Sequence, residues 1–106
     1  MPLVEVSQTN IFRAALKSTP HLVVVDFYAP WCGPCRSLNQ TFVDITSQFK
    51  NVLVIKADVD NLAEISTEFN VARLPTVVFI RFGRELDRVV GADSKAIINK
   101  VITYAV

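Results

Sequence analysis

Apolar residues follow two alternating patterns along this chain: short continuous runs, and longer stretches with an apolar residue at every third or fourth position. The first pattern is typical of buried strands, and the second is typical of helices that pack one face against a sheet. The runs predict strands over residues 1–6, 22–28, 52–57, 76–82 and 85–90. The periodic stretches predict helices over residues 8–18, 34–50 and 61–69, and a last helix that begins after Asp93.

This order of elements predicts a three-layer α/β/α sandwich. Strands that alternate with helices in the first half imply parallel pairing through right-handed crossovers. The last two strands flank Gly83-Arg84, which predicts a hairpin and therefore an antiparallel pair. The expected fold is a central mixed five-stranded sheet with four helices. Residues 22–28 are apolar except for Asp26, as expected of a central strand that is covered on both faces.

Polar residues next to the periodic stretches predict where the helices begin. Ser7 or Thr9 can cap the first helix, and Asp93 can cap the last. Asn61 and Glu64 have the spacing of a capping box for the third helix. The residues expected to face the sheet from the last helix are Ile97, Ile98, Val101 and Ile102.

The length and the net charge of the chain indicate a single domain and give no sign of a nucleic-acid-binding or membrane-spanning protein. The 106 residues make one domain, residues 1–106, which we expect to be a monomer. A formal net charge of +1 gives no reason to expect nucleic acid or an anionic membrane as a partner, and no apolar stretch approaches the about 20 residues of a membrane span. The first residues lack the basic region and apolar stretch of a signal peptide. We therefore expect a cytoplasmic protein, in which paired cysteines are catalytic or metal-binding rather than structural.

The two cysteines of the chain lie three positions apart, in the segment Trp31-Cys32-Gly33-Pro34-Cys35. A disulfide over so short a loop removes little entropy from the unfolded chain, so the spacing points to redox chemistry. Cys32 precedes the first helical turn, where free N–H groups stabilise a thiolate. Cys35 lies one turn further, on the inner face, where burial keeps a thiol protonated. We expect Cys32 to be the exposed nucleophile and Cys35 the thiol that resolves the mixed disulfide.

Other polar residues leave alternatives open. A zinc site needs about four cysteine or histidine ligands, and besides the two thiols the chain offers only His21. Asp26 lies in a buried strand, where a carboxylate is costly unless it is paired or protonated. It is either a core aspartate bonded to Lys56 or water, or a proton acceptor for Cys35 whose pKa is raised by burial and tuned by Lys56. Pro75 opens a strand, and by base rate the bond before it would be trans.

The segment from Val25 to Cys35 strongly resembles the active-site segment of the thioredoxin family. Further family landmarks occur at Lys56–Asp60, Leu74-Pro75-Thr76 and Val90-Gly91-Ala92, so the resemblance covers essentially the whole chain. It implies the thioredoxin fold and a cis bond between Leu74 and Pro75 that faces the disulfide. It also implies a flat groove for an extended segment of the partner, which pairs with the backbone beside Pro75. The groove residues are Trp31, Gly33, Pro34, Leu74, Pro75, Val90, Gly91 and Ala92.

The resemblance also implies an activity. A member of this family reduces protein disulfides through its dithiol, binds no cofactor and is recharged by an NADPH-dependent thioredoxin reductase. Peroxiredoxins and ribonucleotide reductase are the targets that it implies. Gly33-Pro34 resembles the reducing members, whereas oxidants and isomerases usually carry a histidine between the cysteines. Two other functions stay open: a thioredoxin-like binding subunit that uses the groove around Trp31 and Pro75, and a dimer that bridges a metal or cluster.

Three positions depart from the family's pattern. Gln40 replaces a proline that often kinks the helix after the cysteines, so we expect a straighter helix here. Arg73 stands where the family often has a small residue, and a cation at the rim of the groove would favour acidic partners or docking of the reductase. Tyr28 replaces the usual tryptophan, which we interpret as a packing substitution.

Overall fold

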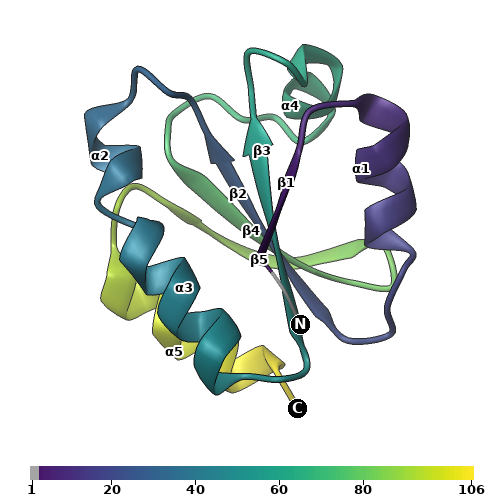
Figure 1. Cartoon of the computed structure of the whole chain (residues 1–106), viewed down its shortest axis with the longest axis vertical. Helices are drawn as coiled ribbons and strands as arrows, with labels where there is room; N and C mark the ends of the chain where they lie inside the picture. Colours follow the sequence, from purple (N-terminus) through teal and green to yellow (C-terminus); the bar gives the residue numbers. More distant parts are fainter. Residues whose placement is uncertain (1–2) are drawn as a thin grey trace.

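A computed structural model describes residues 3–106 and contains one five-stranded sheet (Figure 1). The order of the strands across the sheet is β1-β3-β2-β4-β5. β1 and β2 both pair in parallel with β3, whereas β4 is antiparallel to β2 and to β5. The predicted mixed sheet is therefore confirmed. The strands are β1 (Leu3–Val6), β2 (Leu22–Tyr28), β3 (Val52–Asp58), β4 (Thr76–Arg81) and β5 (Arg84–Val90). Met1 and Pro2, which we predicted in the first strand, lie outside the described residues.

The helices cover both faces of the sheet, which confirms the three layers (Figure 1). α1 and α4 lie on one side, and α3 and α5 lie on the other. None of the helices in residues 3–106 is long and apolar enough to cross a membrane. The helices are α1 (Thr9–Leu16), α2 (Gly33–Arg36), α3 (Asn39–Gln48), α4 (Ala63–Glu68) and α5 (Ser94–Tyr104).

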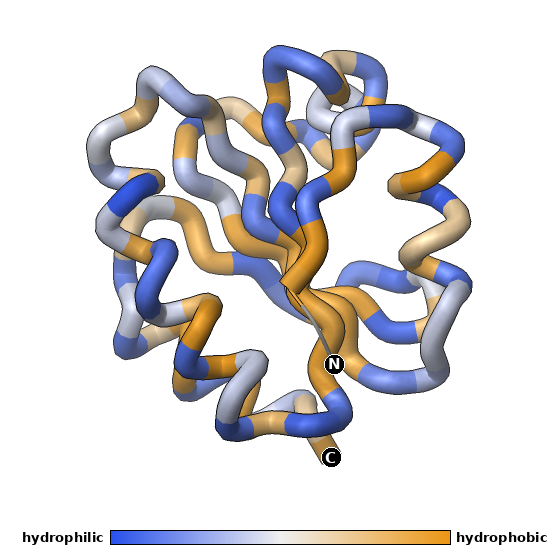
Figure 2. Tube along the Cα trace, in the orientation of Figure 1, coloured by the Kyte–Doolittle hydropathy of each residue, from blue (hydrophilic) through white to orange (hydrophobic). Residues whose placement is uncertain are grey.

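Central strand β2 separates two hydrophobic cores because its side chains alternate between the two faces. Its residues from Leu22 to Phe27 are all buried, and Figure 2 shows apolar positions gathered on the crossing strands. Val23, Val25 and Phe27 join the core beneath α1 and α4. Leu22 and Val24 join the core beneath α3 and α5. By the same alternation, Asp26 faces the layer of α3 and α5.

The helix predicted over residues 34–50 is broken after its first turn. α2 ends at Arg36 and α3 begins at Asn39, so the expectation of a straighter helix is wrong. Ser37 lies in the tight turn that separates the two helices. Its backbone N–H and its hydroxyl both donate to the carbonyl of Pro34, at 3.2 and 2.7 Å, and the next N–H donates to the carbonyl of Cys35. Bonds to the third residue back thus replace the bonds to the fourth residue back that a continuous α-helix has.

Two of the predicted caps are wrong and one is confirmed. α1 begins after Gln8 and α4 begins after Leu62, neither with a side-chain cap. Before α4 the chain forms a turn in which the backbone N–H groups of Asn61 and Leu62 both donate to the carbonyl of Asp58. These backbone bonds take the place of the predicted capping box. Asp93 does cap α5, accepting the N–H of Ala96 at 3.0 Å. The residues that do not act as caps are Ser7, Thr9 and the Asn61–Glu64 pair.

The hairpin turn differs from the prediction by one position, and the last helix buries two of the four residues that we expected to face the sheet. The turn is formed by Phe82 and Gly83, whose φ angles of 53° and 74° suit a tight two-residue hairpin turn, and Arg84 already belongs to β5. Ile98 and Ile102 are 37 % and 58 % exposed, so they do not face the sheet. Ile97 and Val101 are buried, as predicted; because a helix advances 100° per residue, the positions that directly follow them lie outside this buried stripe.

Candidate active site

The two cysteines form a disulfide at the junction between β2 and α2. Their Cα atoms are 5.4 Å apart. Cys32 is the N-cap of α2, and Pro34 lies in the first turn of that helix, as predicted. The loop before α2 is held at both ends: the N–H of Cys32 donates to the carbonyl of Ala29 at 3.1 Å, and Arg36 Nη1 donates to the carbonyl of Pro30 at 3.0 Å. The reactive pair thus lies on a short, well-bonded loop.

Local polarity, rather than exposure, distinguishes the two sulfur atoms. Cys32 is 6 % exposed and Cys35 is 3 % exposed, so the prediction of an exposed Cys32 is wrong for this disulfide form. Both pack with Ala29, against Val59 and Leu74. Cys32 Sγ does accept the backbone N–H of Cys35, at 3.2 Å. Because α2 is only one turn long, we attribute stabilisation of a Cys32 thiolate to this direct N–H bond rather than to the dipole of α2.

Asp26 is completely buried on the central strand. Neither of its carboxylate oxygens accepts a hydrogen bond from the residues that the structure describes. Burial raises the pKa of Asp26 from 3.8 to about 7, and the positive charge of Lys56 acts in the opposite direction. The group therefore titrates near neutral pH, where it can accept and release a proton.

Lys56 lies opposite Asp26 in the parallel pairing of β2 with β3. Its ammonium nitrogen donates to Asn39 Oδ1 at 2.7 Å and lies 4.5 Å from the centre of the Tyr28 ring. Lys56 therefore is not the hydrogen-bond partner of Asp26 that one of our alternatives offered beside water. Lys56 acts on the carboxylate only through its charge.

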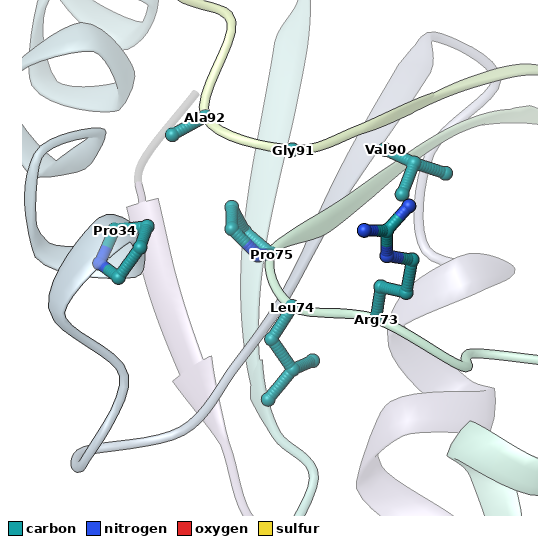
Figure 3. A pocket seen from close by; sticks show the side chains of 7 residues that line it. All are labelled: Pro34, Arg73, Leu74, Pro75, Val90, Gly91 and Ala92. Atoms are coloured by element: carbon teal, nitrogen blue, oxygen red, sulfur yellow. The ribbon is translucent and has the colours of Figure 1, made fainter.

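A hollow of about 300 Å³ lies beside α2 and is lined by segments far apart in the sequence (Figure 3). The bond between Leu74 and Pro75 is cis, as the resemblance implies. Figure 3 shows Pro34 on one side of the hollow and Val90 on the other, with Leu74 and Arg73 pointing in opposite directions. The lining residues are Pro34, Arg73, Leu74, Pro75, Val90, Gly91 and Ala92.

Trp31 lies in a second hollow, on the other side of Leu74, together with Val59. Trp31 as a residue is 70 % exposed, and its Nε1 donates to Asp60 Oδ2 at 3.0 Å. Gly33 lines neither hollow. The structure thus divides the single flat groove that we expected into two hollows that share Leu74. Asp60 is a site residue that we did not assign from the sequence, although it is the last residue of the segment Lys56–Asp60. An exposed tryptophan needs an acceptor for its indole N–H, and that need was the signal for a nearby carboxylate.

Comparison with known proteins gives concordant results. The family model for thioredoxin matches residues 3–104. Thioredoxin H-type 1 of Nicotiana tabacum is 45% identical over 101 residues, which cover 95% of this chain and 80% of that protein. A thioredoxin H-type of Picea mariana is 41% identical over 87 residues, covering 82% of this chain and 70% of that protein. The structure of thioredoxin NaTrxh from Nicotiana alata superposes with a TM-score of 0.93 at 30% identity, covering 98% and 93% of the two chains. Reduced Schistosoma mansoni thioredoxin gives 0.92 at 31% identity, covering 98% and 99%.

The fold and the disulfide at the β2–α2 junction define a thiol-disulfide oxidoreductase. The chain belongs to the thioredoxin family. It reduces protein disulfides through Cys32 and Cys35, needs no bound cofactor, and works with disulfide-containing targets and a reductase as the family does. Residues 3–106 bring no three His, Cys, Asp or Glu side chains together as a metal site.

Proposed function

We propose that Cys32 is the nucleophile and Cys35 the resolving thiol of the reduced protein. The Cys32 thiolate attacks one sulfur of the target disulfide, and the other target sulfur leaves as a thiolate. Cys35 then loses its proton and attacks the Cys32 sulfur, which releases the second target thiolate and closes the Cys32–Cys35 disulfide. Two electrons pass to the target. The hydrogen bond from the Cys35 N–H to the Cys32 sulfur supports this assignment and is the observation that carries it.

We propose that Asp26 accepts the proton of Cys35 in the resolving step. A general base works best when its pKa lies near the working pH, and burial raises the pKa of Asp26 to about 7. The strand that carries Asp26 leads directly into the cysteine loop. Lys56 tunes the carboxylate through its charge, since the two residues are neighbours in the sheet. Gly33 and Pro34 complete the catalytic loop without adding a charged group between the sulfur atoms.

We infer that an extended segment of the target lies across the two hollows. The carbonyl of Pro75 is occupied by the N–H of Gly91 at 2.8 Å. No hydrogen bond joins the backbone of Leu74 to the rest of residues 3–106, so Leu74 offers its N–H and C=O to the target in the manner of an added strand. The residues proposed to contact the target are Trp31, Arg73, Leu74, Pro75, Val90, Gly91 and Ala92.

We further propose the cellular setting. An NADPH-dependent thioredoxin reductase restores the dithiol, and peroxiredoxins and ribonucleotide reductase are among the targets. The protein acts as a cytoplasmic, monomeric carrier in electron transport. Membership of the thioredoxin family supports the reductase, and the near-neutral net charge of +1 supports the absence of nucleic-acid partners. Turnover of the purified protein with NADPH and a thioredoxin reductase tests the recharging step.

Single cysteine variants test the mechanism. Cys32→Ser should abolish reduction of insulin disulfides, whereas Cys35→Ser should accumulate mixed disulfides that mass spectrometry detects. Each variant is the control for the other, because both remove one sulfur from the same loop. Full turnover by Cys32→Ser would overturn the mechanism. Asp26→Asn should slow release of the mixed disulfide, and unchanged release kinetics from pH 6 to pH 9 would exclude Asp26 as the proton acceptor.

A further inference from the structure

Arg73 is the single charged residue among the seven that line the hollow beside α2 (Figure 3). The other six offer only apolar side chains and backbone to a bound segment. Arg73 is exposed, and no carboxylate among residues 3–106 pairs with its guanidinium. The hollow therefore presents an unneutralised cation next to the proposed path of the target.

Two hydrogen bonds hold the turn that begins at Arg73. The hydroxyl of Thr76 donates to the carbonyl of Arg73 at 2.6 Å, which ties the residue to the first position of β4. The N–H of Gly91 donates to the carbonyl of Pro75 at 2.8 Å, which joins the opposite wall to the same turn. Because the walls are held by these bonds, the guanidinium extends from a defined point on the Val90 side of the hollow (Figure 3).

The hollow on the other side of Leu74 is lined by residues without charge: Trp31, Val59, Ser66, Val71, Ala72 and Leu74 itself. The indole of Trp31 is held from outside this lining, since its Nε1 donates to Asp60 Oδ2 at 3.0 Å. A segment that crosses Leu74 therefore meets the positive charge of Arg73 in one hollow and an uncharged lining in the other.

We propose that Arg73 makes this protein select disulfides whose cysteine has an aspartate or glutamate next to it, on the side that lies over the hollow beside α2. This proposal rests on the proposed path of the target across Leu74. A planar guanidinium pairs with a carboxylate through two parallel hydrogen bonds, which fixes the side on which the acid must lie. Arg73 does not touch the reacting sulfur atoms. It is a positioning residue, and its effect falls on association rather than on sulfur exchange.

Matched chromogenic peptides test this selection. Each peptide carries one cysteine joined to 5-thio-2-nitrobenzoate, with aspartate, asparagine or lysine next to the cysteine on one side or the other. Attack by Cys32 on the peptide sulfur releases the coloured thiolate, and Cys35 then releases the peptide thiol. With the acid on the favoured side, kcat/KM should exceed that of the lysine peptide by about 1.5-fold to fivefold, the range expected of an exposed ion pair. The difference should lie in KM and not in kcat.

Charge reversal supplies the decisive comparison. Arg73→Glu should invert the order of the aspartate and lysine peptides, and Arg73→Ala should bring their ratio close to one. Arg84→Glu is the matched control: Arg84 is exposed, has no carboxylate partner in residues 3–106, and lies at the opposite end of the β4–β5 hairpin from Val90. It should leave the wild-type order unchanged. Raising the ionic strength from about 0.01 to about 1 M shortens the screening length from about 30 to about 3 Å and should remove the preference.

Different results identify different failures. Equal rates for the aspartate and lysine peptides with the wild-type protein would overturn the selection while leaving the disulfide chemistry intact. The same inversion in Arg84→Glu would also overturn it, because net charge would then account for the effect. If the wild-type protein releases no thiolate, or if Cys32→Ser releases it as fast, the proposed function itself fails.

Discussion

Replacing Asp26 by asparagine should raise the free energy of unfolding relative to wild type increasingly as the pH rises. Among residues 3–106 Asp26 is the one fully buried carboxylate, and no described group donates a hydrogen bond to it. Its pKa is about 7 in the folded protein against 3.8 for an unperturbed aspartate. The unfolded chain therefore loses this proton at a lower pH than the folded protein does.

The sign and the size of the effect follow from proton linkage. A carboxyl group with a raised folded-state pKa stabilises the fold most at low pH, and that contribution falls as the pH rises from 3.8 to about 7. One pKa unit corresponds to about 1.4 kcal/mol, so the full change amounts to about 4 kcal/mol. About 3 kcal/mol of this falls between about pH 5 and about pH 8. Asparagine does not titrate, so its stability relative to wild type should rise by that amount over this interval.

Denaturant unfolding of the oxidised proteins at several pH values measures this difference. The amide of asparagine introduces its own buried donors, but their cost is independent of pH, so the readout is the slope and not the absolute stability. Asp26→Leu, which has no polar group, should give the same slope. Asp44→Asn removes a carboxylate from the exposed face of α3 and is the control for the loss of one charge. A difference between Asp26→Asn and wild type that stays constant within about 0.5 kcal/mol would refute the reasoning.

Three further substitutions test other parts of the structure. Lys56→Met should raise the pKa of Asp26 further, because the charge of Lys56 lowers it, and NMR titration of the carboxyl carbon measures the change. Asp93→Ala should cost about 1 kcal/mol in denaturant unfolding, since it removes the cap on the N–H of Ala96. Phe12→Ala should cost about 3–5 kcal/mol in the same assay, because the fully buried ring packs against two other phenylalanine rings at centroid distances of 6.2 and 5.9 Å.

Each of these has an exposed counterpart. Lys95→Met removes a lysine from the surface of α5 and should not move the titration of Asp26. Asp44→Ala removes an exposed aspartate that caps no helix, and Ile11→Ala truncates a neighbour of Phe12 that is 50 % exposed. An unchanged Asp26 titration in Lys56→Met, or equal losses for a variant and its counterpart, would contradict the corresponding argument.

Local patterns in the sequence predicted the strands best where burial is continuous. The run of apolar residues over 22–28 coincides with β2, and the hairpin and the capping by Asp93 also follow from residues close together in the chain. The resemblance of the segment around the cysteines to thioredoxins predicted the cis bond before Pro75. The helix prediction failed where backbone hydrogen bonds to the third residue back replace those to the fourth residue back. The apolar spacing continues across the break between α2 and α3, so it did not predict the tight turn there, in which the N–H of Ser37 donates to the carbonyl of Pro34.

The sequence alone determined the reactive pair and the order of the strands, because these depend on residues a few positions apart. Only the tertiary structure decided the surroundings of those groups. Packing of Leu74 and Val59 buries Cys32 as well as Cys35. Burial from both sides raises the pKa of Asp26, while Lys56 bonds to Asn39 instead. Desolvation and charge act through space, and the segments that supply them here lie far apart along the chain.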